Sequence, residues 1–182
     1  MRTVALITMF VVLAGMFCSG KTSTQTSSTA PVRWPKEATA TLTEDQLTQF
    51  VKALPAFSAA LKAASWTPPV LKQGDGVVAS LTPFVEGMNV PGVEDSLKKV
   101  GSSWRGVRPT LYKIFAASAA LSIKAASPEL IAQMKKDTSA AAKKGVKDYE
   151  AFVAACSQIP EANQQTVAKH QQELSALYTL GR

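Results

Sequence analysis

Residues Leu42–Trp66 have the sequence LTEDQLTQFVKALPAFSAALKAASW, which contains both the start and the apolar repeat of a long helix. Thr43 and Gln46 have the spacing of a capping box, in which each side chain satisfies a backbone N–H group of the first turn. Apolar side chains then recur at helical spacing, and they are Leu47, Phe50, Val51, Leu54, Phe57 and Leu61. Pro55 lies inside this pattern and predicts a kink or a local break. The stretch predicts an amphipathic helix that ends near Trp66.

The helical pattern continues through the C-terminal part of the chain. Helices are predicted over 77–87, 93–100, 103–126, 128–157 and 161–180, with turns rich in Pro and Gly between several of them. Strand signals are nearly absent, since no stretch alternates apolar and polar residues over more than a few positions. Many alanines favour helix and allow helices to approach closely. The sequence therefore predicts an all-α domain over 42–182, an antiparallel bundle of about four to five helices.

Residues 1–20 have the pattern of an export signal. Arg2 supplies a short positive region, and the apolar run Val4–Ala14 follows it. This run is too short to span a bilayer, which takes about 20 apolar residues, but it fits the core of a signal peptide. Ser19 and Gly20 then end the run. The sequence predicts an exported protein, and the alternative is an amino-terminal anchor helix.

Cys18 leaves two routes of processing open. The stretch 13–20, LAGMFCSG, resembles a bacterial lipoprotein signal, in which the cysteine is lipidated and becomes the new amino terminus. It departs from that pattern at Phe17, where a small residue is expected, so ordinary cleavage after Gly20 is the alternative. Residues 21–41 begin with a Ser/Thr-rich run and predict a flexible linker. On the lipoprotein interpretation the chain is attached to a membrane through the acyl chains on Cys18.

Composition leaves little for catalysis or metal binding. One His and two Cys exclude multi-His metal centres, four-Cys zinc sites and disulfide-dense scaffolds. The chain has no P-loop, Gly-rich dinucleotide turn, His-Glu-x-x-His or Gly-x-Ser-x-Gly motif. His170 and Cys156 fall on inward faces of consecutive predicted helices, and the simplest interpretation is a buried thiol near a partly buried imidazole. Lys169 and Glu173 have the spacing of a surface ion pair. We expect no catalytic residue, no metal, no cofactor and no enzyme activity.

The formal net charge is +7 at pH 7, and a lysine cluster lies in the predicted helix 128–157. Lys136, Lys143 and Lys147 share a stripe opposite its apolar face, with Lys135 and Lys144 beside them. Such a stripe is most often a solvated surface, and its functional alternative is attraction to anionic lipid or envelope polysaccharide. Nucleic acid fits poorly, because the chain is exported and has no aromatic residues among these lysines. The expected partner is an envelope protein or an anionic polymer.

A second group combines aromatic and basic side chains on one predicted helix. Trp104, Arg108 and Tyr112 follow one another at single-turn spacing, with Arg105 beside them. Such a stripe either contacts an anionic or ring-shaped ligand or forms the edge of a core, where the Arg stem covers the rings.

These patterns together predict the class of the protein. We expect an exported, lipid-anchored bacterial envelope protein with a non-enzymatic structural or interaction role. The alternative is a soluble periplasmic helical bundle that binds an apolar or anionic small ligand. The turn-rich region 70–101 would then serve as its lid.

Overall fold

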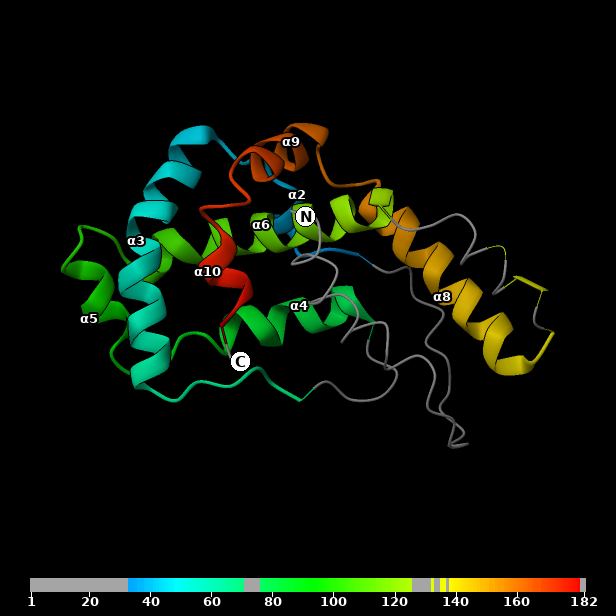
Figure 1. Cartoon of the computed structure of the whole chain (residues 1–182), viewed down its shortest axis with the longest axis horizontal. Helices are drawn as coiled ribbons and strands as arrows, with labels where there is room; N and C mark the ends of the chain where they lie inside the picture. Colours follow the sequence, from blue (N-terminus) through cyan, green and yellow to red (C-terminus); the bar gives the residue numbers. More distant parts are fainter. Residues whose placement is uncertain (1–32, 71–75, 126–131, 133–134, 137, 181–182) are drawn as a thin grey trace.

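The structure is a computed structural model, and it describes residues 33–70, 76–125, 132, 135–136 and 138–180 (Figure 1). The predicted signal peptide, Cys18 and the linker up to residue 32 lie outside the described residues. Within the described part of the chain all regular secondary structure is helical, which confirms the predicted all-α class. No helix in those residues is long and apolar enough to cross a membrane.

The described part of the chain forms more helices than the sequence predicted. In chain order they are α2 (Lys36–Thr39), α3 (Glu44–Ala63), α4 (Val77–Glu86), α5 (Val93–Lys98), α6 (Trp104–Ala125), α8 (Ala140–Cys156), α9 (Glu161–Lys169) and α10 (Ser175–Tyr178). The predicted helices 77–87, 93–100 and 103–126 are found as α4, α5 and α6. Gly101 has a φ of 72° and ends the turn after α5, as its left-handed conformation favours glycine.

Helix α3 begins as predicted and then continues through its proline. Thr43 and Gln46 form the capping box in both directions. The predicted break at Pro55 is absent, because α3 is one continuous helix from Glu44 to Ala63. Leu54 and Phe57, on either side of the proline, are almost fully buried. Packing of both halves against the core offsets the backbone hydrogen bond that proline cannot make.

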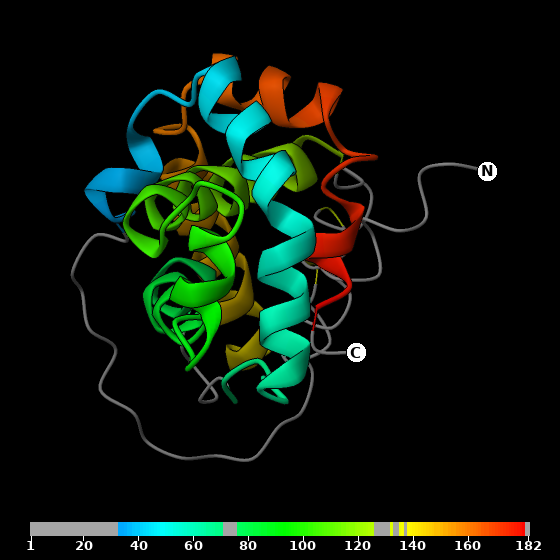
Figure 2. The same cartoon turned by 90° about the vertical axis from the view of Figure 1, so that its left-hand side faces the viewer.

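Helix α6 lies at the centre of the fold. It contacts α2, α3, α4, α5, α8 and α9. In Figure 1 α3 crosses α6 while α4 runs along it, and Figure 2 shows α3, in cyan, running beside the green helices. The sequence predicted one apolar face for α6, but side chains are buried around its circumference, and these include Tyr112, Lys113, Ile114, Ala116, Ala117, Ala119 and Ala120. The alanines let neighbouring helices approach from several sides.

The segment before α3 is packed rather than flexible. Residues 33–41 were expected to belong to the linker, yet Trp34 and Ala38 are buried. The indole Nε1 of Trp34 donates to the backbone oxygen of Ala155 at 2.8 Å, and its ring lies against that of Phe152. These apolar side chains supply enough contact to order the segment. The packed domain therefore begins by Trp34, ahead of the boundary predicted at Leu42.

The two C-terminal predicted helices are both interrupted. The described Thr138 and Ser139 are not helical, so α8 begins at Ala140, where Ser139 Oγ accepts from the N–H of Ala142 at 3.1 Å. The start predicted at 127–129 lies outside the described residues. The helix predicted over 161–180 is found as two helices, α9 and α10. Helix α9 ends at Lys169, and the chain turns before α10 begins at Ser175. This turn directs α10 onto α3, where it packs.

Candidate functional site

The predicted aromatic and basic stripe lies where α2, α4 and α6 meet. Arg108 of α6 donates from Nε to Glu86 Oε1 at 2.6 Å and lies 3.3 Å from Glu37 Oε1 through a terminal nitrogen. Glu86 ends α4 and Glu37 belongs to α2. The hydrogen bond to Glu86 raises the pKa of Arg108 above its ordinary value. The guanidinium is therefore neutralised by two carboxylates of the same chain.

Tyr112 completes this network. Its ring is buried, and its hydroxyl donates to Glu86 Oε1 at 2.8 Å. Burial first, and then the hydrogen bond to Glu86, raises the pKa of Tyr112 above its ordinary value. The central carbon of the Arg108 guanidinium lies 5.2 Å from the centre of the Tyr112 ring, within the range of a cation–π contact. Arg108 and Tyr112 thus share one polar network through Glu86, in which the guanidinium lies over a buried aromatic ring.

The other two residues of the stripe take different positions. Trp104 stacks on Phe57 with ring centres 6.2 Å apart, and its backbone N–H donates to Glu94 Oε2 at 2.7 Å. Arg105 is exposed. An open hollow of about 430 Å³ lies elsewhere, and it is lined by Ala60, Ala63, Ala64, Pro91, Gly92 and Ser96. The four residues of the predicted ligand site therefore do not line that hollow.

Arg108 and Arg105 should respond differently to the same substitution. Arg108→Gln removes a guanidinium that joins three helices, and we expect the free energy of unfolding to fall by about 1 kcal/mol, because the ion pairs are partly exposed. Arg105→Gln removes an equal charge from the surface and should change stability by less than about 0.5 kcal/mol. Urea unfolding of both variants measures the difference. Equal stability of the two variants would contradict the structural role of Arg108.

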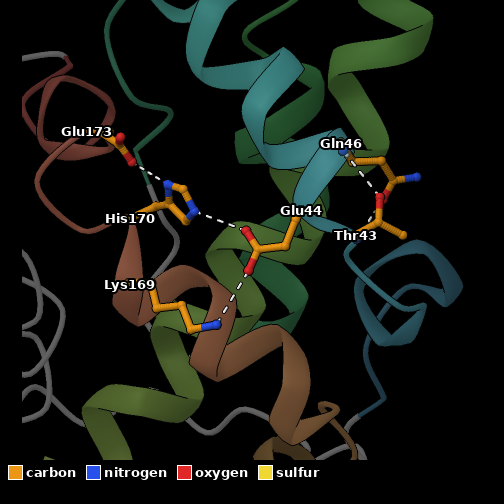
Figure 3. Close-up of polar contacts among 6 residues, drawn as sticks. All are labelled: Thr43, Glu44, Gln46, Lys169, His170 and Glu173. Atoms are coloured by element: carbon orange, nitrogen blue, oxygen red, sulfur yellow. Dashed lines mark hydrogen bonds and ion pairs between the residues drawn. The ribbon is translucent and has the colours of Figure 1, made fainter.

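The only histidine of the chain lies in a polar cluster between α3 and the end of α9 (Figure 3). His170 Nε2 is 3.0 Å from Glu44 Oε2, and its Nδ1 contacts the carboxylate of Glu173. The predicted Lys169–Glu173 ion pair is not found. Lys169 Nζ instead lies 3.6 Å from Glu44 Oε1, and Glu173 contacts His170. The hydrogen bonds to Glu173 and Glu44 raise the pKa of His170, although burial opposes them. The cluster therefore favours the imidazolium form.

Cys156 and His170 do not have the states that a thiolate nucleophile requires. Cys156 is 5% exposed, and burial raises its pKa to about 12, so the thiol keeps its proton at neutral pH. Both ring nitrogens of His170 face carboxylates, which leaves neither directed at the sulfur. No cluster of three or more potential metal ligands occurs among the described residues. These groups give the described part of the chain no arrangement for Cys–His chemistry.

The lysines near α8 divide into paired and unpaired groups. Lys135 Nζ lies 3.0 Å from Glu150 Oε1, and Lys144 Nζ lies 2.6 Å from Asp148 Oδ2. Lys136, Lys143 and Lys147 are exposed and have no carboxylate partner among the described residues. Lys136 precedes the non-helical Thr138 and Ser139, so the predicted single stripe is interrupted, and we call Lys143 and Lys147 of α8 the basic face. In Figure 1 α8 extends away from the helices packed around α6.

Two buried polar residues have no recognisable signal in the sequence. Lys113 is 6% exposed, and its Nζ donates to the backbone oxygen of Thr41 at 2.8 Å and to Gln46 Oε1 at 2.9 Å. Desolvation lowers the pKa of Lys113. Asn163 is fully buried and hydrogen-bonds backbone groups before α3. No local pattern marks either residue, because their partners are distant in the sequence.

Comparison of the chain with protein-family models, with curated proteins and with solved structures finds no match.

Proposed function

We propose that this protein is an exported, lipid-anchored bacterial envelope protein with a non-enzymatic interaction role. On this proposal the lipid on Cys18 holds the chain at a membrane, and the residues before Trp34 tether the helical domain. The domain then binds an anionic envelope partner through the basic face of α8. The pattern of residues 1–20 supports export, and the contacts of the charged residues support the choice of surface.

The proposal rests on which basic side chains are paired with carboxylates and which are not. Arg108 is held by Glu86 and Glu37 inside the chain, so its charge is not available to a partner. By contrast, Lys143 and Lys147 are exposed, lie one turn apart on α8 and have no described carboxylate partner. An exposed lysine carries a strongly hydrated ammonium that suits loose contact with phosphate or carboxylate groups. The basic face is thus the better candidate for an anionic partner than the predicted stripe around Arg108.

Removing the basic face should weaken binding to an anionic surface. Each lysine near such a surface contributes about 1 kcal/mol, so Lys143→Gln with Lys147→Gln should weaken partition roughly 30-fold at physiological salt. The measurement is flotation of the chain from Lys21 onward with phosphatidylcholine vesicles that contain phosphatidylglycerol. This chain lacks Cys18, so no acyl chain contributes to binding. Binding of the unchanged protein should also fall as salt is added.

The matched control removes two lysines from another helix. Lys52 and Lys62 are exposed on α3, and replacing both with Gln gives the same net charge as the α8 variant. We expect this control to retain most of the binding, because contact with a surface is short-ranged at physiological salt, where the Debye length is about 8 Å. Equal losses in the two double variants would show that net charge alone acts, and would contradict a role for the basic face.

The anchor has a separate test. The full-length chain is expressed in a bacterial host, and the intact mass of the protein is measured in the membrane and soluble fractions. A membrane species that begins at Cys18 and carries acyl mass is the expected result. A soluble species that begins at Lys21 would overturn the anchor and favour the free periplasmic protein. The vesicle measurement does not depend on this outcome.

A further inference from the structure

The C-terminal segment, residues 171–180, is held to the domain at its two ends. At one end α10 buries Leu177 and packs on α3, and Tyr178 lies 2.7 Å from Ser118 Oγ of α6 through its hydroxyl oxygen. Leu174, in the turn before α10, is also fully buried. At the other end the segment is joined to α3 through His170 and its two carboxylates. The segment therefore covers part of the core. The contacts among Glu44, His170 and Glu173 hold its first turn against α3.

The geometry of His170 requires a particular protonation state. Glu44 and Glu173 face opposite nitrogens of the ring, as Figure 3 shows, and a carboxylate accepts hydrogen bonds but does not donate them. A neutral imidazole has a single N–H group, so it satisfies one of the two carboxylates and turns a lone pair toward the other. Only the doubly protonated ring donates to both. When the ring loses one proton, it loses its hydrogen bond either to Glu44 of α3 or to Glu173 of the segment. Either loss disconnects the segment from α3 at this end.

The surroundings of His170 favour the cation from several elements. His170 is the C-cap of α9, where the helix dipole stabilises positive charge, and Glu44 is in the first turn of α3, where the dipole stabilises negative charge. The charged groups that face the cluster are Glu44 from α3, Glu173 from the turn and Lys169 from α9. Two carboxylates thus oppose one lysine, and the ring remains positively charged to a higher pH than a free histidine.

We propose that His170 is a pH-dependent clasp, which fastens the C-terminal segment to α3 while the imidazole is doubly protonated and releases it when the ring loses a proton. Because the pKa of His170 is raised in the folded protein, the clasp is complete below the ordinary value of 6.5 and is lost as pH rises through the raised value. Release exposes apolar surface beneath Leu174 and Leu177. The clasp does not depend on the proposed anchor or on the basic face.

Hydrogen exchange of the segment tests the clasp directly. We expect the opening equilibrium of backbone amides in residues 171–180 of the full chain, in mild detergent, to rise roughly five-fold across the titration of His170, after correction for the pH dependence of intrinsic exchange. Amides in the middle of α6 should keep their protection. Because His170 is the only histidine, its imidazole signal in NMR spectra reports the titration without ambiguity.

Two variants separate the clasp from a general effect of pH. His170→Gln removes the titrating group. In this variant, residues 171–180 should open to the same extent at every pH across which His170 titrates in the unchanged protein. Glu161→Gln is the matched control, because Glu161 is an exposed carboxylate of α9 whose partner is Lys124, and it should titrate as the unchanged protein does. The clasp is refuted if His170 titrates at or below 6.5, or if His170→Gln retains the pH dependence.

Discussion

Replacing Asn163 with alanine is expected to lower the free energy of unfolding by about 3 kcal/mol, because a buried backbone N–H group and a part-buried backbone carbonyl lose their partner at once. Asn163 Oδ1 accepts from the N–H of Leu42 at 2.8 Å, and its Nδ2 donates to the backbone oxygen of Ala40 at 2.8 Å. These contacts join α9 to the turn that connects α2 with α3. The measurement is urea unfolding, with Gln165→Ala as control, since Gln165 is exposed on the same helix.

Asn163→Asp gives the same prediction a pH signature. An ionised carboxylate still accepts from Leu42, but it faces the oxygen of Ala40 without a proton to donate. Burial and this repulsion raise the pKa of the new side chain above the ordinary value of about 4. The variant should therefore be nearly as stable as the original below that pH and lose stability as pH rises through the raised pKa. A small, pH-independent loss in both variants would mean that Asn163 does not connect these elements.

Replacing Phe57 with alanine is the second large effect, with an expected loss of about 4 kcal/mol. Phe57 is 0% exposed in the middle of α3. Its ring is edge-on to Phe50 at 6.4 Å and stacked on Trp104 of α6 at 6.2 Å between centres. Alanine leaves a cavity where α3 crosses α6 and removes both aromatic contacts. Guanidinium unfolding followed by circular dichroism measures the loss.

The control at the same position is Phe57→Leu. Leucine keeps most of the buried apolar volume and should cost less than about 1.5 kcal/mol. Tryptophan fluorescence of the folded alanine variant should also change, because Trp104 loses its stacking partner. If alanine and leucine destabilise the protein equally, the contact with Trp104 rather than packing volume supplies the stability, and our account of this crossing is wrong.

The stripe of Trp104, Arg108 and Tyr112 shows which contacts residue spacing can predict and which it cannot. One-turn spacing on a helix places Arg108 against Tyr112, and the two do form a cation–π contact. Spacing says nothing about Glu86 and Glu37, which lie 22 and 71 positions away in the sequence and neutralise the guanidinium. The sequence left open whether the stripe faced a ligand or the core. The carboxylates contributed by α4 and α2 show that Arg108 belongs to an ion-pair network within the chain.

Local signals in the chain specified the helical class, the capping box of Thr43 and Gln46 and the extents of α4, α5 and α6. Caps, glycine turns and apolar periodicity all act within about four residues, so they can be recognised without the fold. The buried circumference of α6, the packing of Trp34 and the contacts of His170 with two carboxylates required the folded molecule. The hydrogen bonds of Trp34 and His170 join residues 121 and 126 positions apart, because side chains so distant meet only when helices pack.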